Sequence, residues 1–153
     1  DTASVIQTTT FKASVKLDCF IPIRKRNILR IANTSEIYVA PEIFQNEVFR
    51  FGGLNSFRGF NEESLYATSK SIFTIEYRYL LDKNSAIFGF LDQGFYVNRS
   101  IQYTHDHPLG LGVGISFGTK VGYFSMCYAL GKQFDNPILM RDARIHFGYI
   151  AYF

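Results

Sequence analysis

Hydrophobic and polar residues alternate along most of this chain with a period of two. Segment Ser71–Leu80 is a clear case, because its alternate positions are apolar or aromatic (Phe73, Ile75, Tyr77 and Tyr79). A β-strand places successive side chains on opposite faces, whereas a helix requires a period of 3.6. The alternation therefore predicts an all-β chain with about seven strands and no credible helix. The predicted strands are Thr10–Phe20, Asn27–Val39, Ser71–Leu80, Ala86–Val97, Leu109–Phe117, Tyr123–Leu130 and Ala143–Phe153.

The length of these strands and the character of their two faces indicate a membrane protein. Strands of about 9–12 residues exceed the five to six that are common in soluble proteins and match a tilted bilayer crossing. In Leu109–Phe117 one face is large and apolar, while the other carries only small residues (Gly110, Gly112, Gly114 and Ser116). In a transmembrane barrel the apolar face meets lipid and the small or polar face lines the lumen. The pattern predicts an antiparallel, up-and-down transmembrane β-barrel, and a soluble β-sandwich is the less favoured alternative.

The predicted connections are alternately short and long. The short ones are Pro22–Arg26, Leu81–Ser85 and Gly118–Gly122, and the long ones are Ala40–Ser64, Asn98–Pro108 and Gly131–Asp142. Outer-membrane barrels have short periplasmic turns and longer extracellular loops. Seven is an odd number, however, and bacterial single-chain barrels have an even number of strands, eight at least. We therefore expect residues 1–153 to form the C-terminal part of a larger barrel, in preference to a half-barrel that closes by oligomerising.

Composition and charge exclude several other classes. The net charge is only +3, and the basic residues are scattered apart from Arg24-Lys25-Arg26, so we expect no nucleic-acid partner. Two cysteines, Cys19 and Cys127, cannot build a disulfide scaffold. His105-Asp106-His107 lacks a further ligand at a defined spacing, so we expect no metal site. We find no catalytic motif and no cofactor-binding motif, and we do not expect an enzyme.

Three motifs follow one another in the second part of the chain. Segment Phe49–Phe60 contains the glycine pair Gly52-Gly53 and then Arg58-Gly59-Phe60. An acidic residue, Glu76, follows on the polar face of the next strand, and Phe90-Leu91-Asp92-Gln93-Gly94 comes in the strand after that. In this order the motifs resemble the signature of the BamA/TamA superfamily of outer-membrane barrels, the bacterial surface antigen type. The resemblance covers Phe49–Phe153.

The resemblance implies that the long loop, about residues 40–64, folds back into the barrel lumen. Arg58 would there contact the inward-facing acids Glu76 and Asp92. The residue types support this role independently, because a permanently charged, forked guanidinium suits two carboxylates. An exposed salt bridge is the simpler alternative and would contribute only about 0–1 kcal/mol. The expected anchor residues of the loop in the lumen are Arg58, Gly59, Phe60, Glu76, Asp92 and Gly94, with Gly52 and Gly53 as loop glycines.

The resemblance also implies a whole barrel of about 16 strands, an even number as such barrels require, preceded by POTRA repeats. The last strand would form one side of the barrel seam and carry the C-terminal assembly signal, with Ile145, Phe147, Tyr149 and Phe153 as its residues. The implied function is assembly, insertion or translocation of proteins at the bacterial outer membrane. The implied partners are the lipid bilayer, client outer-membrane proteins and assembly lipoproteins. A barrel anchor of a patatin-like lipase and a passive, plugged barrel are the alternatives.

Overall fold

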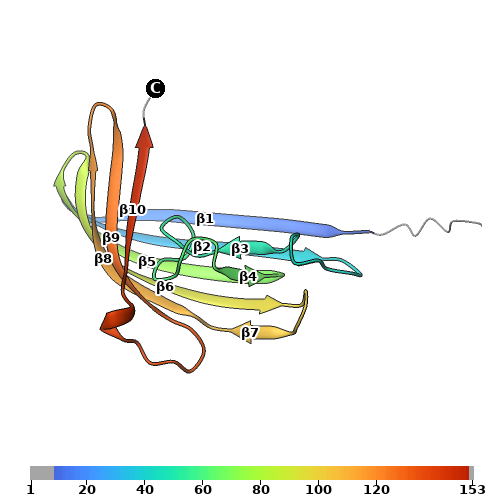
Figure 1. The fold of residues 1–153 in the computed structure, drawn as a ribbon. Coiled ribbons are helices and arrows are strands. Elements are labelled where there is room, and N and C mark those ends of the chain that lie inside the picture. Colours follow the sequence, from blue (N-terminus) through green and yellow to red (C-terminus); the bar gives the residue numbers. More distant parts are fainter. Residues whose placement is uncertain (1–8, 152–153) are drawn as a thin grey trace, which may run out of the picture.

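The computed structural model describes residues 9–151 and is built almost entirely of strands (Figure 1). The only helical element in this part of the chain is a 3-10 turn, η1 (Met140–Asp142). No helix among the described residues is long and apolar enough to cross a membrane. The strands are β1 (Phe11–Arg24), β2 (Asn27–Val39), β3 (Phe49–Phe51), β4 (Leu65–Ala67), β5 (Ser69–Asp82), β6 (Ser85–Asn98), β7 (Thr104–Asp106), β8 (Leu109–Gly118), β9 (Gly122–Lys132) and β10 (Arg144–Ala151).

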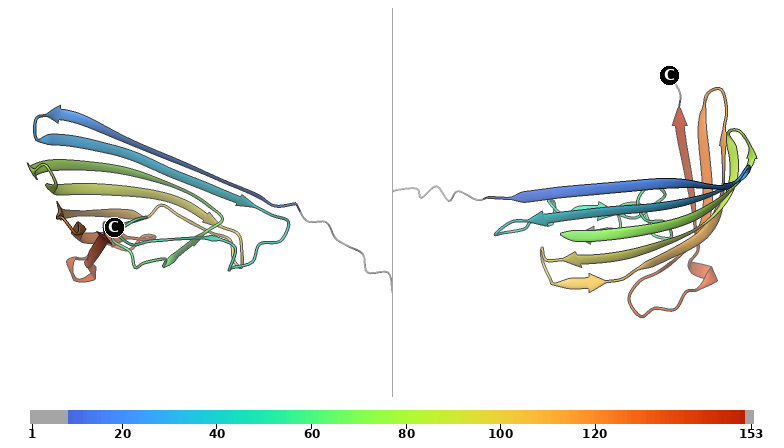
Figure 2. Two further views of the ribbon diagram at one scale, coloured as in Figure 1. Left: turned by 90° about the horizontal axis from the view of Figure 1, so that it is seen from above. Right: turned by 180° about the vertical axis from the view of Figure 1, so that it is seen from behind.

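Seven long strands form one sheet in the order β1-β2-β5-β6-β8-β9-β10. Every neighbouring pair is antiparallel, so the predicted all-β, up-and-down arrangement is confirmed. The short strand β7 pairs with β6, and β3 pairs with β4 in a separate hairpin. The sheet curves strongly but is not closed (Figures 1 and 2). Among the described residues, β1 and β10 each have a partner strand on one edge only.

The strand bounds differ from the prediction mainly at the ends. The predicted turn at Pro22–Arg26 is wrong in its start, because β1 runs on to Arg24 and Pro22 pairs with Ile28. Proline is compatible with a strand that lies at a sheet edge or at a bulge, and the register of β1 shifts between Pro22 and Arg24. The short strands β3 and β7 lie within predicted loops, and β4 lies between the predicted loop and the predicted strand Ser71–Leu80; all three were missed. Phe153 lies outside the described residues.

The curved sheet has an apolar outer face and a polar inner face, as the alternation predicts. Many large apolar residues of the outer face are exposed to solvent, and Ile145 on β10 is 72% exposed. The concave face instead carries charged residues, glycines and buried aromatic rings, and the connection between β2 and β5 folds against it (Figure 2). Exposed outer-face residues from neighbouring strands include Val15, Leu17, Ile31, Ile75, Tyr77, Ile87, Leu91, Val113, Met126 and Phe147.

The buried core lies between this connection and the concave face. One cluster joins loop aromatics to β5 and β6, and its members are Phe51, Phe57, Phe60, Leu65, Ala67, Ile72 and Tyr96. A second cluster comprises Phe88, Phe90, Cys127 and Ala129, with Leu54 of the loop packed against it. Residues 9–151 form no second large sheet that faces the first. The core is therefore loop against sheet, and the described residues do not form a β-sandwich.

Candidate functional site: the loop anchor on the concave face

The tip of the long loop is a compact turn that ends at Arg58. The amide of Gly52 donates to Ser56 Oγ at 2.9 Å, and the amide of Phe57 donates to the Gly53 carbonyl at 3.1 Å. Gly53 has a φ of 93°, in the left-handed region where a side chain is strained. The predicted loop glycines thus shape the turn from which Arg58 projects.

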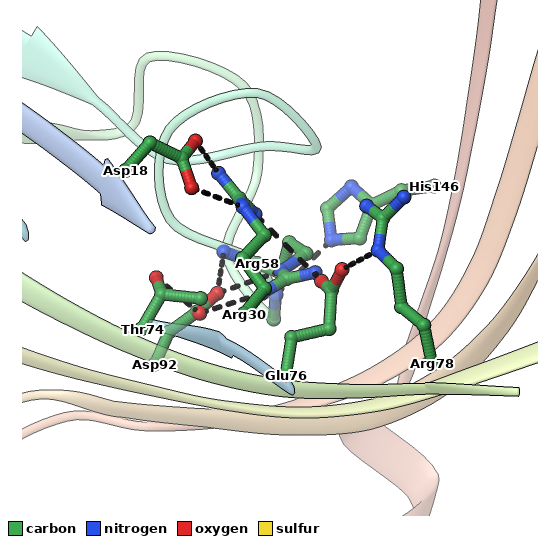
Figure 3. Close-up of polar contacts among 9 residues, drawn as sticks. Asp18, Arg30, Arg58, Thr74, Glu76, Arg78, Asp92 and His146 are labelled. Atoms are coloured by element: carbon green, nitrogen blue, oxygen red, sulfur yellow. Dashed lines mark hydrogen bonds and ion pairs between the residues drawn. The ribbon is translucent and has the colours of Figure 1, made fainter. Parts of the chain in front are cut away.

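Arg58 reaches the inner wall of the sheet and binds both predicted acids (Figure 3). Its Nε donates to Asp92 Oδ2 at 2.8 Å and its Nη2 to Asp92 Oδ1 at 2.7 Å, a bidentate pair. Its Nη1 donates to Glu76 Oε2. The guanidinium carbon lies 3.6 Å from the ring centroid of Phe90, in cation–π contact. Strands β5 and β6 therefore hold the loop through one side chain.

This ion cluster is buried, so its strength differs from that of a surface pair. The side chains of Glu76 and Asp92 are 1% and 2% exposed, and that of Arg58 is 8% exposed. Burial by itself lowers the pKa of the Arg58 guanidinium, but hydrogen bonding to Asp92 and attraction to both carboxylates outweigh it and raise that pKa. Arg58 remains charged, and a loss of its charge would leave two buried carboxylates short of a partner.

Two further arginines complete the cluster. Arg78 Nε donates to Glu76 Oε1, and Arg30 Nη1 lies 3.9 Å from Glu76 Oε2. Arg30 also forms a bidentate pair with Asp18 on β1, through bonds of 2.9 Å and 2.7 Å. Asp92 depends more heavily on the loop, because its only other side-chain donor is Thr74 Oγ1, at 2.8 Å. These three arginines and three acids are formally neutral together. The sequence reasoning missed Arg30 and Arg78, although the strand alternation places Arg78 on the face of Glu76.

The glycines of the wall make room for different groups. A Cβ on Gly110 would collide with the carbonyl oxygen of Arg58, so this glycine lets the loop approach. At Gly112 and Gly114 a Cβ would instead meet neighbouring backbone and the rings of Phe90 and Phe88. Gly112 and Gly114 thus leave space for aromatic rings of the sheet, and not for the loop.

Aromatic residues of the loop fill the space beside the anchor. Phe60 is buried and stacks on Phe57, with ring centroids 5.0 Å apart. A Cβ on Gly94 would lie 3.2 Å from the Phe57 ring, so Gly94 leaves space for it. Phe57 is fully buried and contacts Phe51 edge-on. The sequence reasoning singled out Phe60 and Gly94 but not Phe57, which is more central.

The loop also contacts the last strand of the sheet. The amide of Gly59 donates to His146 Nε2 at 3.1 Å, and Arg144 Nε donates to Asn61 Oδ1 at 2.8 Å. A Cβ on Gly59, whose φ is 92°, would lie 2.6 Å from the Leu130 carbonyl oxygen of β9. Arg58 and Gly59 are adjacent in sequence, so this dipeptide braces β5 and β6 against β9 and β10.

A second attachment holds the stem of the loop, and the sequence reasoning missed it. Lys70 on β5 is buried, pairs with Glu36 at 2.9 Å, and places its Nζ 4.8 Å from the ring centroid of Phe51. Lys12 on β1 lies 4.5 Å from the ring centroid of Phe49. Since Lys70 has the same strand parity as Glu76, the alternation contained the signal that it points inward.

Other predicted residues lie away from this site. Ile145, Phe147 and Tyr149 are exposed on the outer face of β10. His105 and His107 flank a buried Asp106, which accepts the amide of Phe134 at 2.8 Å. Among the described residues no group of three or more His, Cys, Asp or Glu side chains is arranged to hold a metal ion.

No protein-family model matches this chain, and no curated protein matches it. The geometry shows an arginine on a long loop that is fixed to an acidic wall and braced against an edge strand. Such an arrangement fixes the loop to the concave face of the sheet.

Proposed function

We propose that this chain forms part of the wall of a transmembrane β-barrel in the bacterial outer membrane. We further propose that the barrel belongs to a protein assembly, insertion or translocation factor that resembles BamA/TamA. The observation that carries the proposal is the buried pairing of Arg58 with Glu76 and Asp92 on the concave face. The motif resemblance leads us to expect this contact between a lumenal loop and the barrel wall.

The two faces of the sheet support the membrane location. Soluble monomers rarely expose a contiguous apolar surface of more than a few hundred Å², yet the outer face exposes large apolar residues on each of the long strands. Their lengths, from 8 described residues in β10 to 14 in β1, β5 and β6, suit tilted crossings of a bilayer. The charged residues of the cluster lie on the opposite face, away from the hydrocarbon.

The strand directions favour additional strands over a ring of copies. Six antiparallel pairings lead from β1 to β10, so these two edge strands run in the same direction. Copies related by rotation about a barrel axis would join β10 to β1 in parallel. An odd number of further strands closes the sheet with antiparallel neighbours throughout and satisfies both open edges, as the hydrocarbon of a membrane requires.

In this proposal the loop anchor has a structural and gating role, and β10 borders the seam. A strand edge with free backbone groups can pair with an extended segment of a client protein. The proposed partners are therefore client outer-membrane proteins and assembly lipoproteins, together with the bilayer itself.

Two measurements test the proposal in order. The protein extracted from outer membranes should migrate differently on denaturing gels before and after heating, and heat-independent mobility would contradict the barrel. A photo-crosslinking amino acid at Phe147 on β10 should then capture newly made outer-membrane proteins. Ile75 on β5 is the matched control, because it is also an exposed outer-face residue but lies within the sheet. Equal capture at both positions, or none, would refute the assembly role and favour a passive barrel.

A further inference from the structure

The end of the sheet that carries the short turns is strongly basic. The turns between β1 and β2, β5 and β6, and β8 and β9 lie at the same end, because each joins antiparallel neighbours directly. Five basic residues and one acidic residue lie at these turns, and all are exposed. Among the described residues none of the five basic side chains lies within 4.0 Å of an acidic partner. They are Arg24, Lys25, Arg26, Lys83 and Lys120, and the acidic residue is Asp82.

This basic turn end, defined by those six residues, dominates the charge of the whole chain. Its formal charge is +4, whereas the net charge of the chain is +3, so all the other residues together carry −1. The loop anchor does not contribute to this uneven distribution of charge, because its arginines and acids balance one another.

The basic side chains adjoin the apolar outer face. Ile23, Leu81 and Val121 lie in or beside the three turns and are exposed large hydrophobic residues. The three turns also follow one another along the sheet, each separated from the next by at least two strand spacings, or about 10 Å. The basic groups thus form a row along the rim of an apolar surface instead of one compact patch. A row of this kind matches the boundary between hydrocarbon and headgroups better than it matches a compact acidic protein.

We propose that the basic turn end binds the headgroups of anionic phospholipids in the leaflet next to the short turns. The inference rests on the proposed function, because the rim meets headgroups only if the outer face lies in a bilayer. Lys and Arg near an anionic surface are attracted to it, and at 0.1 M ionic strength salt screens this attraction beyond a distance of about 10 Å.

The test uses the protein purified from its native membrane and placed in phosphatidylcholine vesicles. Electron paramagnetic resonance of spin-labelled lipids gives the association of phosphatidylglycerol relative to phosphatidylcholine. We expect a preference of about fivefold for phosphatidylglycerol at low salt. The triple variant Lys25→Gln, Lys83→Gln and Lys120→Gln removes one charge from each turn. In this variant the ratio of phosphatidylglycerol to phosphatidylcholine association should fall to nearly one. The same fall is expected for the wild type at 0.5 M salt.

The matched control removes the same charge from the opposite end of the sheet. Arg50, Arg99 and Arg141 are exposed and lie in the long connections, so their replacement by Gln should leave the lipid preference unchanged. An equal preference in the wild type and the turn variant would overturn the proposal. A second result would also overturn the proposal: the wild type shows no lipid preference, and the turn variant loses an acidic protein that co-purifies with the wild type. The basic turn end would then be a docking surface for a protein. Heat-dependent gel mobility, measured on the same samples, shows separately whether the barrel itself has formed.

Discussion

Replacing Arg58 by Met should release the tip of the loop while the sheet stays intact. The substitution keeps much of the apolar volume over Phe90 but removes both side-chain donors to Asp92 and the donor to Glu76. Glu76 retains Arg78, whereas Asp92 retains only two neutral donors, Thr74 Oγ1 and the backbone amide of position 58 at 3.3 Å. The main cost therefore falls on Asp92, as a buried carboxylate without a cationic partner.

The size of the effect follows from this burial. Removing one partner of a buried ion pair costs about 3–5 kcal/mol, against about 0–1 kcal/mol for an exposed pair. If the loop opens locally, this loss lowers the hydrogen-exchange protection of the Arg58 and Gly59 amides by about 150- to 5000-fold. Hydrogen exchange with mass spectrometry of the purified protein measures the change. The amides of β5 and β6 serve as the internal reference, because their ladder should remain protected.

Three further variants make the test specific. Arg141→Met is the matched control, because this arginine is 81% exposed on its side chain and its ion pair with Asp142 spans 3.9 Å. Adding Asp92→Asn to Arg58→Met should restore part of the protection, since the amide removes the unpaired buried charge. Arg58→Lys should fall between the wild type and Arg58→Met, because Lys keeps the charge but lacks the bidentate fork. A change of less than about fivefold in Arg58→Met would refute the anchor, because an exposed pair would account for it.

Three other substitutions probe the loop at separate points. Gly110→Ala places a methyl group against the Arg58 carbonyl and should destabilise the docked loop by about 1–3 kcal/mol, measured as faster hydrogen exchange of the Gly59 amide. Gly89→Ala is the control and should have no effect, because its methyl group would meet only an atom 3.9 Å away. His146→Leu should speed hydrogen exchange of the β10 amides relative to those of β1, and His146→Gln, which keeps an acceptor, should restore part of the protection. Equal rates in the wild type and both variants would show that the Gly59–His146 contact does not stabilise β10. Lys70→Met should expose β3 and β4 to added protease while the amide of Gly59 stays protected, and simultaneous loss at both places would show that the loop has one attachment and not two.

The strands and their two faces follow from the sequence because alternation is a local property. A side chain points to the face opposite its neighbour in any strand, so the polar face of Glu76 and Asp92 and the apolar face of Ile75 and Leu91 needed no knowledge of the rest of the fold. The alternating short and long connections likewise predicted the antiparallel order of the sheet. The pairing of Arg58 with both acids was expected only through the motif resemblance and the chemistry of the guanidinium.

The tertiary structure alone decided which further residues join the anchor. The contacts of Arg30 with Glu76 and of Gly59 with His146 join positions that are 46 and 87 residues apart, and they depend on strand register and sheet curvature. Alternation indicates which face a side chain occupies but not its partner across the sheet, because one face carries many polar residues. The second attachment of the loop, at Lys70, could not be predicted for the same reason. The sequence determines side-chain direction because this property repeats within each strand. The long-range contacts depend on the tertiary structure, because they form only when the curved sheet brings its distant strands around the loop.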